Sequence, residues 1–85
     1  MEDYKLILVA LPSLTYSLSY VAPWGEVVYN TNFFGQDLLK ELEQFLVEYP
    51  GQNSHLLVYG PKIYTENLAK RIDNAGLFDL VTLEQ

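Results

Sequence analysis

The chain has 85 residues, of which 49% are apolar and 19% are charged, proportions that are typical of a folded domain and exclude a disordered chain. A chain of this length buries only one core, so residues 1–85 are expected to form a single globular domain. Eleven acidic residues against five scattered basic ones give an acidic protein with a net charge of −6, which argues against a nucleic-acid partner. No cysteine is present, which excludes disulfide bonds and thiolate metal sites.

The first predicted element is a strand over residues 4–11, YKLILVAL, which is a nearly continuous apolar run. Such runs are typical of strands that are covered on both faces, so this strand is expected at the centre of a sheet. The acidic start, and an apolar run much shorter than the roughly 20 residues of a membrane span, argue against a signal peptide and a membrane partner. A cytoplasmic location is therefore the default expectation.

Residues 14–31 are predicted to form a β-hairpin with its turn at Pro23–Glu26, where Gly25 can adopt a positive φ. In the first strand, large side chains alternate with small hydroxyl-bearing ones, which indicates a strand with one buried face. The face with the large side chains is expected in the core and comprises Tyr16, Leu18 and Tyr20. The other face, with Ser17 and Ser19, is then free to contact another chain.

The second half of the chain predicts two helices and two strands. Residues 35–49 have apolar side chains at helical spacing, with Asn32 or Gly35 as the expected cap. Residues 55–59, HLLVY, are predicted to form a second buried strand, and Gly60–Pro61 to open a helix that Gly76 ends. The apolar stripe expected on this helix comprises Tyr64, Leu68, Ile72 and Ala75. Residues 80–83 are predicted as the last strand.

The expected fold class is therefore α/β (α+β), a five-stranded mixed sheet with the element order β-β-β-α-β-α-β, in which an antiparallel meander precedes two helix-connected strands. This order resembles the core of the ribonuclease H-like fold, with sheet order 3-2-1-4-5 and strand 2 antiparallel to the others. The resemblance implies catalytic carboxylates on the first strand and near the fourth. Residues 6–10 and 56–59 are apolar or aromatic instead, so the resemblance is to a truncated form without these carboxylates.

Known catalytic and nucleotide-binding sequence motifs do not occur in the chain. His55 is the one histidine, and its place beside Ser54 at a strand entry fits a strand-edge residue. The glutamates of the first helix, at positions 41, 43 and 48, point in different directions and do not converge on a metal. We therefore expect no catalytic residue, no metal site and no cofactor, which favours a protein that is not an enzyme.

Two candidate sites follow from the sequence. The first is the strand-to-helix turn at residues 59–65, where backbone N–H groups could hold a small anion, and its residues are Gly60, Lys62, Tyr64 and Thr65. The second is a protein interface on the hairpin, for which Trp24 is the natural anchor, with the packing of Trp24 on the domain's own core as the alternative. The expected interface residues are Ser17, Ser19, Trp24 and Val28.

Three functions remain open at this point. The first is a non-catalytic interaction module that forms a homodimer through the 14–31 hairpin or binds another protein there. The second is a small anionic-ligand-binding or enzymatic domain that uses the 59–65 turn. The third is a stacking surface for single-stranded nucleic acid made by Tyr16 and Tyr20, and the shortage of lysine and arginine argues against it.

Overall fold

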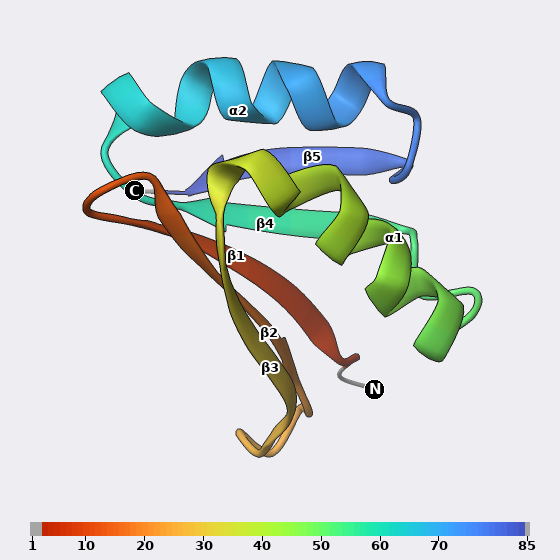
Figure 1. Cartoon of the computed structure of the whole chain (residues 1–85). Helices are drawn as coiled ribbons and strands as arrows, with labels where there is room; N and C mark the ends of the chain where they lie inside the picture. Colours follow the sequence, from red (N-terminus) through yellow and green to blue (C-terminus); the bar gives the residue numbers. More distant parts are fainter. Residues whose placement is uncertain (1–2, 85) are drawn as a thin grey trace.

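The computed structural model describes residues 3–84, and its five strands and two α-helices follow one another in the expected order (Figure 1). The strands are β1 (Lys5–Leu11), β2 (Thr15–Val21), β3 (Val27–Phe34), β4 (His55–Tyr59) and β5 (Leu80–Glu84). The helices are α1 (Leu38–Glu48), which a 3-10 turn η1 (Gly35–Asp37) precedes, and α2 (Lys62–Asn74). The predicted fold class, a five-stranded mixed sheet with two helices, is confirmed.

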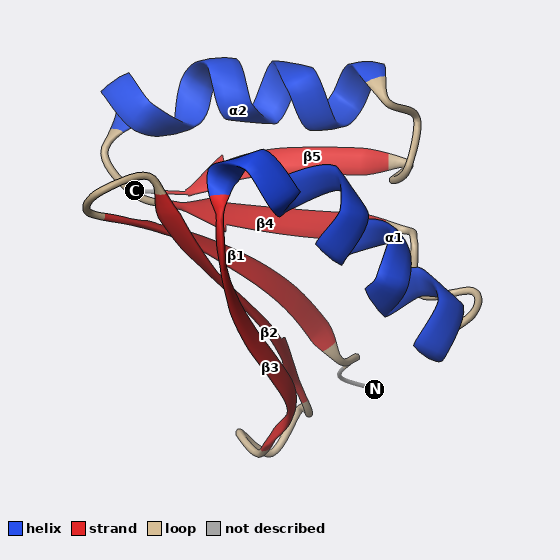
Figure 2. Cartoon of the chain, in the orientation of Figure 1, coloured by secondary structure: helices blue, strands red, loops and turns tan. Residues whose placement is uncertain are grey.

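The strands form one mixed sheet in the order β3-β2-β1-β4-β5 (Figure 2). β2 is antiparallel to both of its neighbours, whereas β1, β4 and β5 run parallel to one another. The central position of β1 is confirmed. Its predicted coverage on both faces is wrong, because α1 and α2 lie on the same face of the sheet (Figure 1).

The direction of the chain explains why both helices share one face. Two connections join parallel strands through a helix, β3–α1–β4 and β4–α2–β5, and both step across the sheet in the same direction. Such connections are right-handed in nearly all proteins, and two right-handed steps in one direction place their helices on the same face. The opposite face of the sheet therefore has no helix in residues 3–84.

The core lies between the two helices and the sheet face that they cover. β2 alternates as predicted, with Tyr16, Leu18 and Tyr20 buried on this face. The side chains that are completely inaccessible come from both layers and include Leu8, Leu18, Leu38, Leu42, Phe45, Leu56, Val58 and Ile72. At about 0.8 kcal/mol for each buried CH₂ group, these side chains supply the main driving force for folding.

Helix ends and stripes differ from the sequence prediction in two places. The strand β3 continues to Phe34, so Asn32 is a strand residue, and the N-cap of α1 is Asp37, without a side-chain capping hydrogen bond, in place of the expected Asn32 or Gly35. The buried stripe of α2 begins at Thr65, while Tyr64 and Ala75 are exposed. Gly76 has a φ of +71°, which confirms the predicted left-handed helix end.

The alternation of β2 gives a direct test of the core. Leu18→Ala should lower the free energy of unfolding by about 2 to 4 kcal/mol, because a completely buried side chain leaves a cavity. Ser17→Ala should change it by no more than about 0.5 kcal/mol, since Ser17 lies on the uncovered face. Urea denaturation followed by circular dichroism measures both, and a larger loss for Ser17→Ala would show that the register is reversed.

Candidate functional site

The sheet face opposite the helices, which we call the open face, is covered by no element of residues 3–84. Its side chains follow from the register, because directly paired residues point to the same side of a sheet. At its centre are Ile7 and Val9 of β1 and Leu57 of β4, all partly exposed. Its other members are Lys5, Leu11, Thr15, Ser17, Ser19, Val21, Val27, Asn30, Asn32, Phe34, His55, Tyr59, Leu80, Thr82 and Glu84.

The open face has a polar half on β2 and β3. The amide nitrogen of Asn30 donates to Ser17 Oγ at 3.1 Å, to Ser19 Oγ at 2.8 Å and to the carbonyl of Leu18 at 3.2 Å. One side chain therefore ties both predicted interface serines to the neighbouring strand. An acceptor site of each serine hydroxyl is therefore already occupied within the sheet.

The other half of the open face, on β1, β4 and β5, is mainly apolar and carries few charges. At its outer edge His55 Nε2 lies 2.7 Å from Thr82 Oγ1, which pairs the histidine within the sheet. Lys5 and Glu84 have opposite charges, so the face is close to neutral although the protein carries −6. The two helices carry more acidic side chains than the open face does, and these include Glu41, Glu43, Glu48, Glu66 and Asp73.

The other two predicted interface residues, Trp24 and Val28, lie outside the open face. Trp24 is 70% exposed at the hairpin turn, where its Nε1 donates to Glu26 Oε1 at 3.1 Å. Its ring meets the Tyr4 ring edge-on, with 5.8 Å between the centroids. Val28 is the extra residue at a β-bulge opposite Tyr20 and Val21, and it lines a depression on the helix side. The four predicted residues therefore do not form one surface, because Ser17 and Ser19 lie on the open face, Val28 lines the depression and Trp24 lies at the turn.

The depression beside Val28, which we call the aromatic depression, has a volume of about 450 Å³. Its lining residues come from the segment before β1, from β2 and β3, and from the end of α1 with the loop after it: Tyr4, Tyr20, Val28, Glu48, Tyr49, Pro50 and Gln52. No local pattern in the sequence indicates this site, because its rings come from three separate segments, and only the tyrosine content of the chain points to it.

Ring contacts hold the walls of the aromatic depression in place. Tyr4 stacks on Tyr20 with centroids 5.2 Å apart, and Tyr49 stacks on the buried Phe45 at 5.0 Å. The Tyr20 hydroxyl donates to Gln52 Oε1 at 2.8 Å. Burial, with smaller effects of Tyr4 and Tyr49, raises the pKa of Tyr20 above its ordinary value.

Two of the four residues of the predicted anion site, Gly60 and Thr65, pack against their neighbours at the start of α2. Thr65 is buried and its hydroxyl donates to the Pro61 carbonyl at 3.3 Å. Gly60 has a φ of +146°, and a Cβ atom there would lie 2.9 Å from Ala10 Cβ. Lys62 and Tyr64 are exposed. The anion hypothesis stays a prediction that depends on Lys62, Tyr64 and the first N–H groups of the helix.

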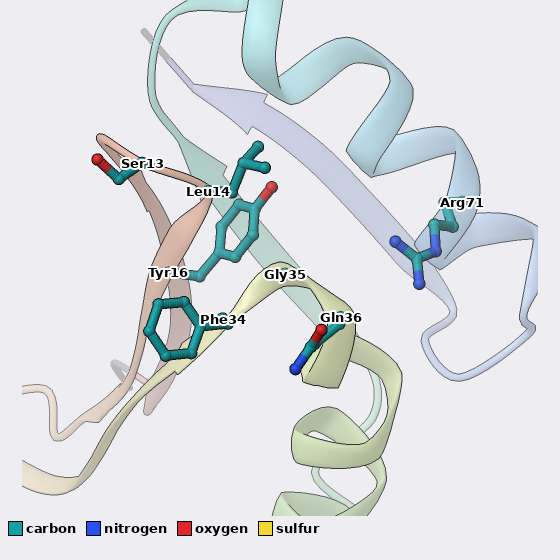
Figure 3. Close-up of a pocket in the computed structure, with 7 residues that line it drawn as sticks. All are labelled: Ser13, Leu14, Tyr16, Phe34, Gly35, Gln36 and Arg71. Atoms are coloured by element: carbon teal, nitrogen blue, oxygen red, sulfur yellow. The ribbon is translucent and has the colours of Figure 1, made fainter.

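Another open depression, of about 600 Å³, lies between the β1–β2 turn and the start of α1 (Figure 3). Arg71 reaches toward it from α2, opposite the ring of Tyr16, and Gln36 lies between them (Figure 3). At its rim Ser13 and Leu14 both have positive φ, at 64° and 57°. Its lining contains no carboxylate and no histidine, and its titratable side chains are Tyr16 and Arg71.

Comparison of the chain with protein-family models, with curated proteins and with solved structures gave no match. Within residues 3–84, no three side chains from histidine, aspartate and glutamate gather where a metal ion could bind. Neither helix of the described chain has the length and apolar character needed to cross a membrane.

A comparison of Gly60, at the predicted anion site, with Gly76, at the end of α2, tests whether Gly60 has a packing role. Gly60→Ala should lower the free energy of unfolding by about 1 to 3 kcal/mol more than Gly76→Ala does. Both positions have positive φ, but only at Gly60 would the new methyl group meet a neighbouring side chain. Urea denaturation of the two variants measures the difference, and equal losses would contradict a packing role for Gly60.

Alkaline pH should destabilise the domain through its buried tyrosines. The raised pKa values of Tyr20 and Tyr29, both caused first by burial, mean that the folded state keeps protons that the unfolded state loses above about pH 10. Stability from these groups is complete below that pH and falls as the pH rises further. Tyr20→Phe should lower the free energy of unfolding by about 1 kcal/mol at neutral pH, because one hydrogen bond is lost. It should also reduce the loss of stability above pH 10.

Urea denaturation at a series of pH values between 8 and 11 checks this prediction. The control is Tyr64→Phe, which removes a hydroxyl from the exposed surface of α2 and should change neither quantity. An unchanged alkaline decline in Tyr20→Phe would contradict the assignment.

Proposed function

We propose that this domain is a non-catalytic interaction module that self-associates through the open face of its sheet. One observation carries the proposal: β1 and β4 have the continuous apolar sequence of strands covered on both sides, yet Ile7, Val9 and Leu57 lie on a face that no element of residues 3–84 covers. A second layer from another chain would complete the burial that this composition favours.

The size of the open face suits a dimer. Strands about 4.8 Å apart, with about 3.3 Å per residue, give a face of about 20 by 20 Å for five strands of five to eight residues. This projected area of about 400 Å² is a large part of the 800 Å² of accessible surface that each partner buries in a standard interface. The exposed side chains of Leu11, Phe34 and Leu80 at its rim add to that area.

Charge favours a second copy of this chain as the occupant. Two molecules with a charge of −6 repel each other, and the repulsion is smallest where the approaching surfaces carry little charge. The open face carries one lysine and one glutamate, whereas other surfaces of the domain carry more of the carboxylates. Depletion of charge is also what distinguishes the centre of protein interfaces from other surfaces.

The polar half of the open face is partly hydrogen-bonded within the sheet. Polar groups that already have partners lose less on leaving water than unpaired groups do. Asn30 binds both serine hydroxyls and a backbone carbonyl, so these acceptors have partners before a second chain arrives. The side chain of Asn32 and the hydroxyl hydrogens of the two serines would form their hydrogen bonds across the interface.

The strand order, with β2 antiparallel to the rest, supports the proposal that the domain is a truncated relative of the ribonuclease H-like fold. The absence of catalytic activity is part of the same proposal. β1 and β4 carry apolar or aromatic residues from 6 to 10 and from 56 to 59, where active members of that fold carry carboxylates. The anion-binding alternative at Lys62 and Tyr64 has no additional observation in its favour.

Ser17→Arg tests the proposal, because a long charged side chain at the polar half of the open face would have to leave water in the dimer. The variant should fold as a monomer and weaken self-association by at least tenfold. Sedimentation velocity over a range of protein concentrations measures this effect. The matched control is Gln44→Arg, which makes the same charge change on the exposed side of α1 and should leave association unchanged.

A monomer at high micromolar concentration of the unaltered chain would contradict the dimer. Equal weakening by Ser17→Arg and Gln44→Arg would contradict the open face as its interface.

A further inference from the structure

We propose that the aromatic depression binds a proline-rich segment of another protein in the polyproline II conformation, with a basic residue of that segment beside Glu48. The inference concerns a different surface from the open face and does not depend on self-association. At about 450 Å³, the depression falls within the range of about 300 to 1,000 Å³ that is usual for ligand sites.

The walls of the aromatic depression are suited to proline rings. Proline-rich segments bind grooves lined by aromatic side chains, because both partners are rigid and lose little conformational entropy. Tyr4 is held by its stack on Tyr20, and Tyr49 by its stack on the buried Phe45. Pro50 adds a third rigid apolar group. The binding surface therefore exists before any ligand arrives, which lowers the cost of binding.

The hydrogen-bonding groups of the depression also match such a segment. A polyproline II chain has carbonyl groups without internal partners, and its prolines have no N–H to donate, so it needs donors from the groove. Gln52 accepts the Tyr20 hydroxyl through its Oε1, which leaves both hydrogens of its amide nitrogen for a ligand. The hydroxyls of Tyr4 and Tyr49 make no hydrogen bond within residues 3–84 and can donate as well.

Charge indicates that the ligand is basic. The lining contains the carboxylate of Glu48 and no lysine or arginine, within a protein of net charge −6. An arginine or lysine next to the prolines would therefore pair with Glu48 and would be attracted over a longer range. Within residues 1–85 the four prolines, Pro12, Pro23, Pro50 and Pro61, are isolated from one another and form no proline-rich segment. The proposed occupant is therefore a segment of another protein.

Titration of the full chain into a fluorescein-labelled peptide of repeated proline, with arginines at one end, tests the proposal by fluorescence anisotropy. We expect saturable binding that Tyr4→Ala weakens by at least tenfold, since it removes one wall, and that Tyr4→Phe weakens less. Glu48→Gln should weaken binding severalfold, with a smaller effect at high salt. The matched controls are Tyr64→Ala and Glu43→Gln, an exposed tyrosine on α2 and an exposed glutamate on α1, and both should bind within twofold of the unaltered chain.

Two further measurements keep the result independent of folding. Circular dichroism of each variant shows whether the domain is folded, and Tyr4→Phe retains the ring stack if Tyr4→Ala is unstable. Trp24 is the one tryptophan, and its edge contact with Tyr4 should make its indole N–H signal in NMR spectra shift when the peptide binds. No saturable binding, equal affinity for a peptide with alanine in place of proline, or equal losses in the control variants would overturn the proposal.

Discussion

The direction in which the chain crosses its own sheet determines which surfaces this domain offers. From β3 to β4 and from β4 to β5 the chain steps the same way, and the right-handed rule then places α1 and α2 together on one face. A single helix layer buries one set of side chains from each strand and leaves the alternate set to solvent. The open face is thus a consequence of topology, and no local feature of β1 or β4 produces it.

Aromatic packing attaches α1 to the antiparallel half of the sheet. Phe45 of the helix is completely buried and contacts the rings of Tyr20, Tyr29 and Tyr49 at centroid distances between 5.0 and 5.4 Å. Edge-to-face and offset contacts at such distances contribute about 0.5 to 1.5 kcal/mol each beyond the burial of area. The Phe45–Tyr49 contact also fixes one wall of the aromatic depression, whose lining includes Tyr4, Pro50 and Gln52 from the loops before β1 and after α1.

Local patterns in the sequence were enough to predict the elements, because each pattern reflects one strand or one helix. The alternation in β2 correctly assigned Tyr16, Leu18 and Tyr20 to the core, and Gly76 correctly marked the end of α2. The apolar run of β1 could not reveal that a single helix layer covers the sheet, since that depends on the direction of crossovers far along the chain.

Sites assembled from distant segments were beyond the reach of such patterns. The lining of the aromatic depression includes both Tyr4 and Tyr49. The depression at the start of α1 is lined by Arg71 of α2 and by residues of the β1–β2 turn. Asn30 shows the same limit on a smaller scale: its sequence position gives no sign that it binds Ser17 and Ser19, because the partnership depends on the register of β2 and β3. Gly60 was predicted only to open α2 beside free backbone N–H groups, while its contact with Ala10 depends on how closely β1 and β4 pair.

The two proposed surfaces differ in the chemistry that each can recognise. The open face is nearly neutral and partly hydrogen-bonded within the sheet, so it suits a partner with the same properties, which a second copy has by definition. The aromatic depression is concave, has unpaired donors and carries a carboxylate, so it suits a basic proline-rich segment of another protein. Because they occupy different faces of the sheet, a dimer through the open face would present two aromatic depressions at once. A protein with two proline-rich segments could then bind both, and the second contact would form at a high effective concentration without any new interaction. Self-association would in that way strengthen the binding of a partner that each single domain holds weakly.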